Sequence, residues 1–325
     1  MIPNKLKAGD EVRVISPATS LAIVDESVRK LAVKRLKDLG LNVRFSKNAE
    51  EIDEGSSSTI ESRMDDLHEA FADKNVKAIL TTLGGYNSNQ LLKYINYELI
   101  KNNPKIFCGY SDITALSNAI YRKTGLITYS GPHFSTFGME KGANYTLDFF
   151  KKCMIDEEPI NIVPASYWSD DKWYMNQTDR HFIKNSGYSV ICEGSGEGTL
   201  IGGNLCTLNL LQGTEFMPSL KNSVLFIEDD YESNALTFDR DLQSVLHLPD
   251  FEAVRGIVIG RFQKGSNISE ETIRKIVHSK KELSSIPVIY HADFGHTTPI
   301  FTFPIGGHVK IQAKDEQVKI IIVHH

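Results

Sequence analysis

A serine at the turn between a predicted strand and a predicted helix is the first residue of chemical interest. The segment Ile106–Thr114 reads IFCGYSDIT, with an apolar strand pattern before Ser111 and a helical pattern after it. At such a turn the hydroxyl points into a cleft, and the N–H of Asp112 can stabilise a developing oxyanion. Ser111 is therefore a candidate nucleophile. The alternative role of a serine at this position is to cap the helix. Ile113 stands where the common G-x-S-x-G motif has its second glycine.

Two glycines follow the neighbouring predicted strand, residues 76–82. Gly84 and Gly85 should emerge at the same edge of the sheet as Ser111, because the carboxyl ends of parallel strands meet there and ligands bind there. The Gly85 N–H is a candidate second oxyanion donor. The alternative is that the glycine pair only forms a tight turn.

A serine nucleophile needs a base, and His296 is the first candidate among the histidines. It lies in a loop after the predicted strand 287–290, where its ring can reach a cleft. His291 and His133 are the competing candidates, and a lone loop histidine can also be structural.

An acid that orients the histidine is the third requirement of such a site. Glu228 ends the apolar run 224–227 and is placed to hold the second ring nitrogen of the histidine. The alternative is a solvated acidic loop. His291, Asp293 and His296, together with the acidic cluster at 228–232, could also bind zinc or manganese, but their spacing matches no H-E-x-x-H or comparable motif, so we expect no metal.

The elements that must position these residues fall into three stretches. Residues 1–150 alternate strand and helix patterns and predict an α/β domain with a mostly parallel sheet. Residues 151–187 lose this periodicity and predict a connector or lid, or else a plain surface connection. Residues 188–325 are rich in strands and predict a smaller C-terminal domain of mixed α/β, barrel-like architecture.

Composition excludes several classes of function. Lys and Arg number 36 against 41 Asp and Glu, a net charge of −5, which does not favour nucleic acid as a partner. We find no signal peptide and no apolar stretch long enough for a membrane span, so a cytoplasmic protein is expected. The four cysteines lack C-x-x-C spacing and are expected to be free, mostly buried thiols.

Taken together, the motifs resemble the serine peptidase family of LD-carboxypeptidases and microcin C immunity proteins. The resemblance extends over nearly the whole chain, and its specificity comes from the order of the motifs rather than from any one of them. The segments that carry it are 6–10, 14–17, 84–85, 109–112, 201–205, 226–229, 295–296 and 303–306.

This resemblance implies a triad with Ser111 as nucleophile, His296 as general base and Glu228 as its orienting acid. It also implies that Gly85 and Asp112 form the oxyanion hole. The implied fold is an N-terminal α/β domain that faces a smaller C-terminal domain across a cleft. Members of the family typically act as homodimers without a metal or other cofactor.

The sequence is more similar to the microcin-immunity branch, for which the resemblance implies a peptidyl or aminoacyl adenylate as substrate. It implies that Trp173, with Trp168 as second candidate, stacks on the base and that Asn204 lies among the substrate-binding residues. An indole plane suits a nucleobase, although either tryptophan could simply anchor the connector. The alternative substrate is a murein tetrapeptide cut before its terminal D-alanine. A peptide or nucleotide sensor with a vestigial triad is the alternative outside enzymes.

Overall fold

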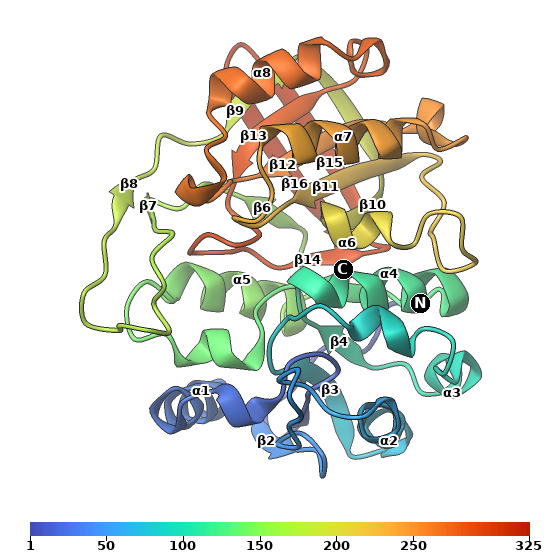
Figure 1. The fold of residues 1–325 in the computed structure, drawn as a ribbon, viewed down its shortest axis with the longest axis vertical. Coiled ribbons are helices and arrows are strands. Elements are labelled where there is room, and N and C mark those ends of the chain that lie inside the picture. Colours follow the sequence, from blue (N-terminus) through green and yellow to red (C-terminus); the bar gives the residue numbers. More distant parts are fainter.

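Two β-sheets organise the chain, and the computed structural model describes residues 1–325 (Figure 1). The first sheet has six strands in the order β14-β5-β4-β3-β1-β2. All neighbours are parallel except β14 and β5. Its strands are β1 (Glu11–Ile15), β2 (Asn42–Phe45), β3 (Val76–Thr81), β4 (Ile106–Cys108), β5 (Thr128–Ser130) and β14 (Phe303–Ile305).

Helices cover both faces of this first sheet, so its central strands are buried on both sides. In β3, Ala78 and Leu80 pack into one apolar cluster with α1 and α5, whereas Ile79 packs into another with α2 and α4. This explains the continuous apolar runs of these strands in the sequence. The helices are α1 (Glu26–Asp38), α2 (Ile60–Ala72), α3 (Tyr97–Asn102), α4 (Thr114–Thr124) and α5 (Asn144–Met154).

The second sheet has eight strands in the order β6-β16-β15-β10-β11-β12-β13-β9. The strands from β10 to β13 are parallel to one another, and the outer pairs are antiparallel. Its strands are β6 (Ile160–Ile162), β9 (Ser189–Cys192), β10 (Gly194–Asn204), β11 (Ser223–Glu228), β12 (Gly256–Gly260), β13 (Val288–Ala292), β15 (His308–Lys314) and β16 (Gln317–His324).

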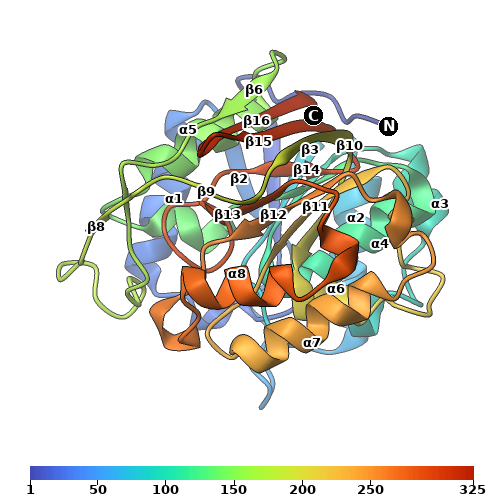
Figure 2. The ribbon, with the colours of Figure 1, turned by 90° about the horizontal axis from the view of Figure 1, so that it is seen from above.

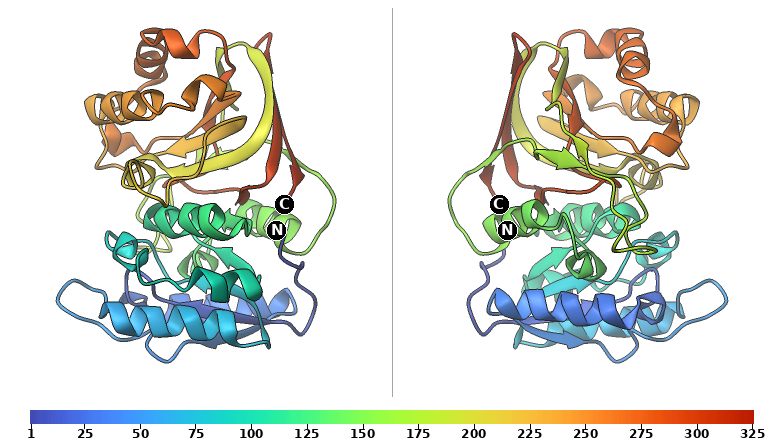
Figure 3. Two further views of the ribbon diagram at one scale, coloured as in Figure 1. Left: turned by 90° about the vertical axis from the view of Figure 1, so that its right-hand side faces the viewer. Right: turned by 90° about the vertical axis from the view of Figure 1, so that its left-hand side faces the viewer.

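The second sheet is strongly curved, and helices cover its convex face (Figures 2 and 3). These helices are α6 (Leu205–Asn209), α7 (Ala235–Leu246) and α8 (Glu270–His278). The opposite face is filled by phenylalanines, among them Phe226, Phe294 and Phe303, whose ring centroids lie 5.2–5.6 Å apart. These rings belong to the same apolar cluster as the core of the first sheet, so one continuous core joins the two halves.

The mixed α/β fold class predicted from the sequence is confirmed, with three local differences. Strand β14, which lies in the predicted C-terminal domain, pairs with β5 in the first sheet. The long strand β10 was not predicted, since five of its eleven residues are glycines. Helix α5 continues to Met154, so the expected boundary at residue 150 falls inside a helix.

Residues 151–187 contain the end of α5, strand β6 of the second sheet and a small two-stranded sheet of β7 (Tyr167–Trp168) and β8 (Ile183–Lys184). The segment loops outward beside the boundary between the two halves (Figure 1). None of the helices is long and apolar enough to cross a bilayer. All four cysteines are free as expected, but only Cys108 and Cys153 are buried.

Candidate active site

Ser111 lies where β4 ends and a short 3₁₀ turn, Ser111–Ile113, leads into α4. Its φ of 59° is in the left-handed region, which costs a residue with a Cβ of order 1 kcal/mol and is typical of functional turns. The predicted strand–turn–helix context of Ser111 is present.

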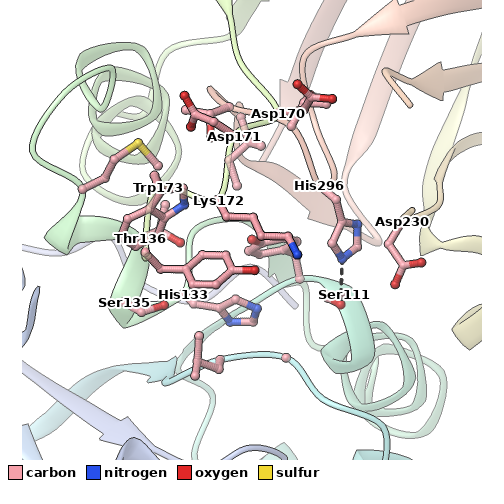
Figure 4. Close-up of a pocket in the computed structure, with 18 of the residues that line it drawn as sticks. Ser111, His133, Ser135, Thr136, Asp170, Asp171, Lys172, Trp173, Asp230 and His296 are labelled. Atoms are coloured by element: carbon pink, nitrogen blue, oxygen red, sulfur yellow. Dashed lines mark hydrogen bonds between the residues drawn. The ribbon is translucent and has the colours of Figure 1, made fainter. Parts of the chain in front are cut away.

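The Ser111 hydroxyl lies 2.9 Å from Nε2 of His296, and Nδ1 of His296 lies 2.7 Å from Oε2 of Glu228 (Figure 4). With Nδ1–H donating to the carboxylate, Nε2 is left free to accept the serine hydrogen. Glu228 ends β11 and is 2% exposed, so its orientation is set by the surrounding core. Ser111, His296 and Glu228, which are far apart in the sequence, therefore form one continuous chain of hydrogen bonds.

A glycine before His296 makes room for the acid. Gly295 has a φ of +100°, and a Cβ at this position would overlap the carboxylate of Glu228. The chain can therefore pass directly against Glu228 and present the His296 ring to it.

The charges around His296 favour its protonated form. Burial by itself would lower the pKa of His296, but the charge and hydrogen bond of Glu228, with the charges of Asp230 and Asp229, raise that pKa to about 8. An imidazolium that forms during a reaction would be stabilised by the same carboxylates. The arrangement suits a base that must take up a proton from Ser111.

The segment Gly84–Gly85 lies against the Ser111 turn. A Cβ at Gly84 would come within 2.9 Å of Cβ of Ser111, and the Gly85 N–H has no acceptor in the protein. Gly85 has a φ of +156° and packs so closely on Thr19 that a Cβ would lie 2.8 Å from its Oγ1. The close approach therefore requires glycine here.

The side chain of Asp112 has a structural task in the same turn. The buried carboxylate accepts the backbone N–H of Ser88 at 2.9 Å, and the Ser88 hydroxyl donates to the Asp112 carbonyl at 2.8 Å. Burial raises the pKa of Asp112 against the lowering effect of these hydrogen bonds. The two contacts tie the glycine loop to the serine turn.

The competing histidines have other environments. His133 is 2% exposed, and its Nδ1 is hydrogen-bonded to Oγ1 of Thr81 at 2.7 Å. Its ring packs at a tilt of 30° against Tyr110, with 4.3 Å between ring centroids. Burial and the nearby His296 lower the pKa of His133 to about 3, so its ring is neutral. His291 faces Glu270, 3.6 Å away, and makes no contact with Ser111.

The residues considered for a metal do not converge. Asp293 is engaged by Arg261 at 3.4 Å and by the backbone N–H of Ala165 at 2.8 Å. His291 and His296 make separate contacts with different carboxylates. No three His, Cys, Asp or Glu side chains are grouped to hold an ion.

A cavity of about 500 Å³ opens over Ser111 and His296. Trp173 lines it, as do Lys172 and Asp230 (Figure 4). The cavity lies between the two halves, and the connector forms one wall. Its volume is within the range of small-molecule sites.

The other two expected substrate-binding residues do not line this cavity. Trp168 packs under the guanidinium of Arg261, 4.9 Å from its ring centroid, and so anchors the connector. Asn204 ends β10 beside Glu228 in the register. Its side chain caps α6 and donates to Oδ1 of Asp229 at 3.2 Å. Both therefore have structural roles in this structure.

Sequence reasoning did not select Tyr110, Lys172 and Asp230, although all three line the cavity. Each lies within two positions of a residue that was selected. The Tyr110 ring packs against His296, with 5.5 Å between centroids, and against His133 on another side. The sequence could have indicated these three residues only by their closeness to the selected candidates.

Comparisons with known proteins match both halves. Residues 12–131 match the LD-carboxypeptidase N-terminal domain, and residues 197–311 match the LD-carboxypeptidase C-terminal domain.

Curated relatives match over nearly their full length. The chain is 56% identical to "Putative carboxypeptidase YocD" of Bacillus subtilis, with all of both chains covered. It is 32% identical to the microcin C7 self-immunity protein MccF of Escherichia coli, covering 98% of this chain and 95% of the relative. It is 30% identical to "Probable murein peptide carboxypeptidase" of Bacillus subtilis, covering 98% and 93%.

Solved structures of relatives have the same fold. An MccF-like protein from Bacillus anthracis is 59% identical and superposes with a TM-score of 0.99 over all of both chains. The microcin C7 self-immunity protein MccF in complex with aspartyl sulfamoyl adenosine is 29% identical, with a TM-score of 0.89 over 100% of this chain and 99% of that one. The two domain matches and these relatives show that the chain belongs to the LD-carboxypeptidase family of serine peptidases, the S66 family.

Proposed function

We propose that this protein is a serine hydrolase in which Ser111 is the nucleophile, His296 the general base and Glu228 the acid that orients it. The observation that carries the proposal is the continuous hydrogen-bonded order from Ser111 through His296 to buried Glu228, beneath a cavity of about 500 Å³. A sensor with a vestigial triad would not need these three side chains to be aligned and hydrogen-bonded.

The reaction follows from these roles. Ser111 Oγ attacks the carbonyl carbon of an amide-type bond while its proton passes to Nε2 of His296. The oxyanion is held by the N–H groups of Gly85 and Asp112. When the C–N bond breaks, His296 returns the proton to the departing nitrogen. A water molecule, activated by the same histidine, then attacks the acyl-enzyme to release the acid and restore Ser111.

The substrate that we propose is an aminoacyl or peptidyl group joined to an adenylate-like nucleotide, cleaved at that junction. Trp173 lies in the wall of the cavity, where its indole can stack on a base. A structural neighbour of 29% identity has been solved with aspartyl sulfamoyl adenosine. Self-immunity or detoxification is the corresponding biological role.

A murein tetrapeptide, cut before its terminal D-alanine, is the second candidate substrate. It is favoured by the 30% identity over nearly the whole chain to a relative named as a murein peptide carboxypeptidase. For either substrate we propose a cytoplasmic homodimer, which sedimentation of the purified protein will test.

The decisive experiment compares wild type with Ser111→Ala on an aminoacyl sulfamoyl adenosine and on a murein tetrapeptide, with products followed by mass spectrometry. Loss of the nucleophile should reduce turnover by about 10⁴-fold or more. Ser284→Ala, which removes an exposed hydroxyl far from the cavity, is the matched control and should retain activity.

The outcomes separate the candidates. Ser111-dependent cleavage of the adenylate alone supports the immunity-type function, and cleavage of the tetrapeptide alone supports the carboxypeptidase. Turnover that survives in Ser111→Ala, or no turnover of either compound by wild type, would refute the proposed function.

A further inference from the structure

The charged side chains that line the cavity are mostly acidic. Apart from His133 and His296, only Lys172 brings a basic group, against four carboxylates: Asp25, Asp170, Asp171 and Asp230. An excess of carboxylates disfavours anionic groups of a ligand unless these carboxylates are already neutralised or hydrogen-bonded. The partners of each acid therefore decide what the cavity can bind.

Three of the four carboxylates make hydrogen bonds or ion pairs with other groups of the protein. Asp25 caps helix α1, and Asp170 accepts the backbone N–H of Lys264 at 2.7 Å. Asp171 pairs with Arg180 at 2.6 Å, and this arginine side chain is fully buried. These carboxylates hold the connector and the start of α1. The charge of Asp171 is balanced by Arg180, and that of Asp170 by Lys264 at 4.0 Å, whereas exposed Asp25 accepts hydrogen bonds from Ser27.

Asp230 differs from Asp170 and Asp171 because it has no cationic protein partner, and from Asp25 because it is half-buried rather than exposed. Its Oδ1 accepts the backbone N–H of Glu232 at 2.8 Å, and its Oδ2 accepts no hydrogen bond from the protein. The backbone at this position is held, since the Asp230 carbonyl accepts the Ser266 hydroxyl at 3.1 Å and the N–H of Ser233 at 3.2 Å. A half-buried carboxylate with a fixed backbone and one free oxygen is left at the cavity wall.

The position of Asp230 relates it to the reacting bond. Figure 4 shows the Asp230 carboxylate beside the His296 ring, with Lys172 on the other side of that ring in this view. When the carbonyl carbon of a substrate reaches Ser111, the groups on either side of that carbonyl would lie near charged side chains of opposite sign. Asp230 is the anion, and Lys172 is the cation.

We infer that Asp230 is a specificity-determining residue that binds a free ammonium group on the carbon next to the scissile carbonyl. The inference rests on the proposed function and narrows its substrate class to acyl donors with an unblocked α-amino group. A carboxylate on the carbon that flanks the leaving nitrogen, as in a peptide that ends in alanine, would have to lie on the Lys172 side. An acyl group that carries a negative charge beside its carbonyl would be repelled by Asp230.

The test compares two substrates that differ only at the α-nitrogen: alanyl sulfamoyl adenosine, with a free ammonium group, and its neutral Nα-acetyl derivative. For wild type we expect kcat/KM to be at least about 10-fold higher for the free amine, the effect of one charged hydrogen bond. In Asp230→Asn this preference should fall to about 1, through loss of activity on the free amine. The ratio is measured within each enzyme, so any change in the His296 base cancels.

Glu232→Gln is the matched control, because it removes a neighbouring carboxylate that instead accepts the Tyr86 hydroxyl at 2.7 Å. It should keep the wild-type preference. Equal Ser111-dependent turnover of both substrates by wild type, or an unchanged preference in Asp230→Asn, would overturn the inference and leave the proposed hydrolase intact. Absence of Ser111-dependent turnover of either compound would overturn both.

Discussion

Replacing Glu228 with glutamine tests whether the charge of Glu228 raises the pKa of His296. In the wild type the pKa of His296 is about 8, because Glu228 outweighs the effect of burial. Without that charge, burial should return the pKa to 6.5 or below. The change of about 1.5 units corresponds to about 2 kcal/mol of stabilisation of the imidazolium.

Two effects of Glu228→Gln on the rate then oppose each other. Where His296 is neutral in both proteins, the variant should be slower by about 10²–10⁴-fold, because the imidazolium formed during attack is less stable and its ring is less well oriented. At pH 7, however, the neutral fraction of the base rises from about a tenth to about three quarters. The deficit of the variant should therefore be about eightfold smaller at pH 7 than at pH 9.

The assay is the pH dependence of kcat/KM, whose acid limb reports the base of the free enzyme. Activity should rise with pH in both proteins, with a midpoint near pH 8 in the wild type and at or below pH 6.5 in the variant. Glu271→Gln, which removes an exposed carboxylate on α8, should keep the wild-type midpoint. An acid limb that stays at pH 8 in Glu228→Gln would show that Glu228 does not control His296.

Three further substitutions test the geometry of the site and of the connector. Gly295→Ala should lower kcat by about 10²-fold or more with little change in KM, because the new Cβ would overlap the Glu228 carboxylate and the φ of +100° disfavours alanine. Circular dichroism will show whether the fold is kept, and normal kcat in a folded variant would contradict this reasoning. Trp173→Ala should raise KM for an adenylate by about 10-fold, from the loss of one stacking contact, while leaving tetrapeptide cleavage less affected. Trp168→Ala should instead lower the midpoint of thermal unfolding, since this indole packs on Arg261 rather than in the cavity.

The sequence alone was sufficient for the family, the α/β class and the candidate triad. Its strongest signals were local, namely apolar runs that end in chemically useful residues at Ser111 and Glu228. Such signals arise because a buried parallel strand must be apolar along its length, whereas the residue at its carboxyl end meets solvent or ligand.

Strands that pair with segments distant in the chain could not be predicted from the sequence. β10 contains glycines that weaken any strand pattern, and it is stabilised by two neighbours distant in the chain, β11 and β15. β14 leaves the C-terminal half to pair with β5, which no local propensity can indicate. Tertiary context overrides local preference in both cases.

The two tryptophans and the aspartates of the site likewise show what the sequence determines and what only the tertiary structure decides. Residue type alone does not show which of Trp173 and Trp168 lines the cavity, although the family resemblance favoured Trp173, nor does it single out Asp230 among the aspartates. Only the folded connector turns Trp173 toward the cavity and Trp168 toward Arg261, and only the structure pairs Asp171 with Arg180 while leaving Asp230 without a cation. Sequence determined which chemical groups are available and where each strand delivers them. Tertiary structure decided which of these groups are neutralised by partners from distant segments and which remain free to meet a substrate, because burial and pairing depend on contacts between residues far apart in the chain.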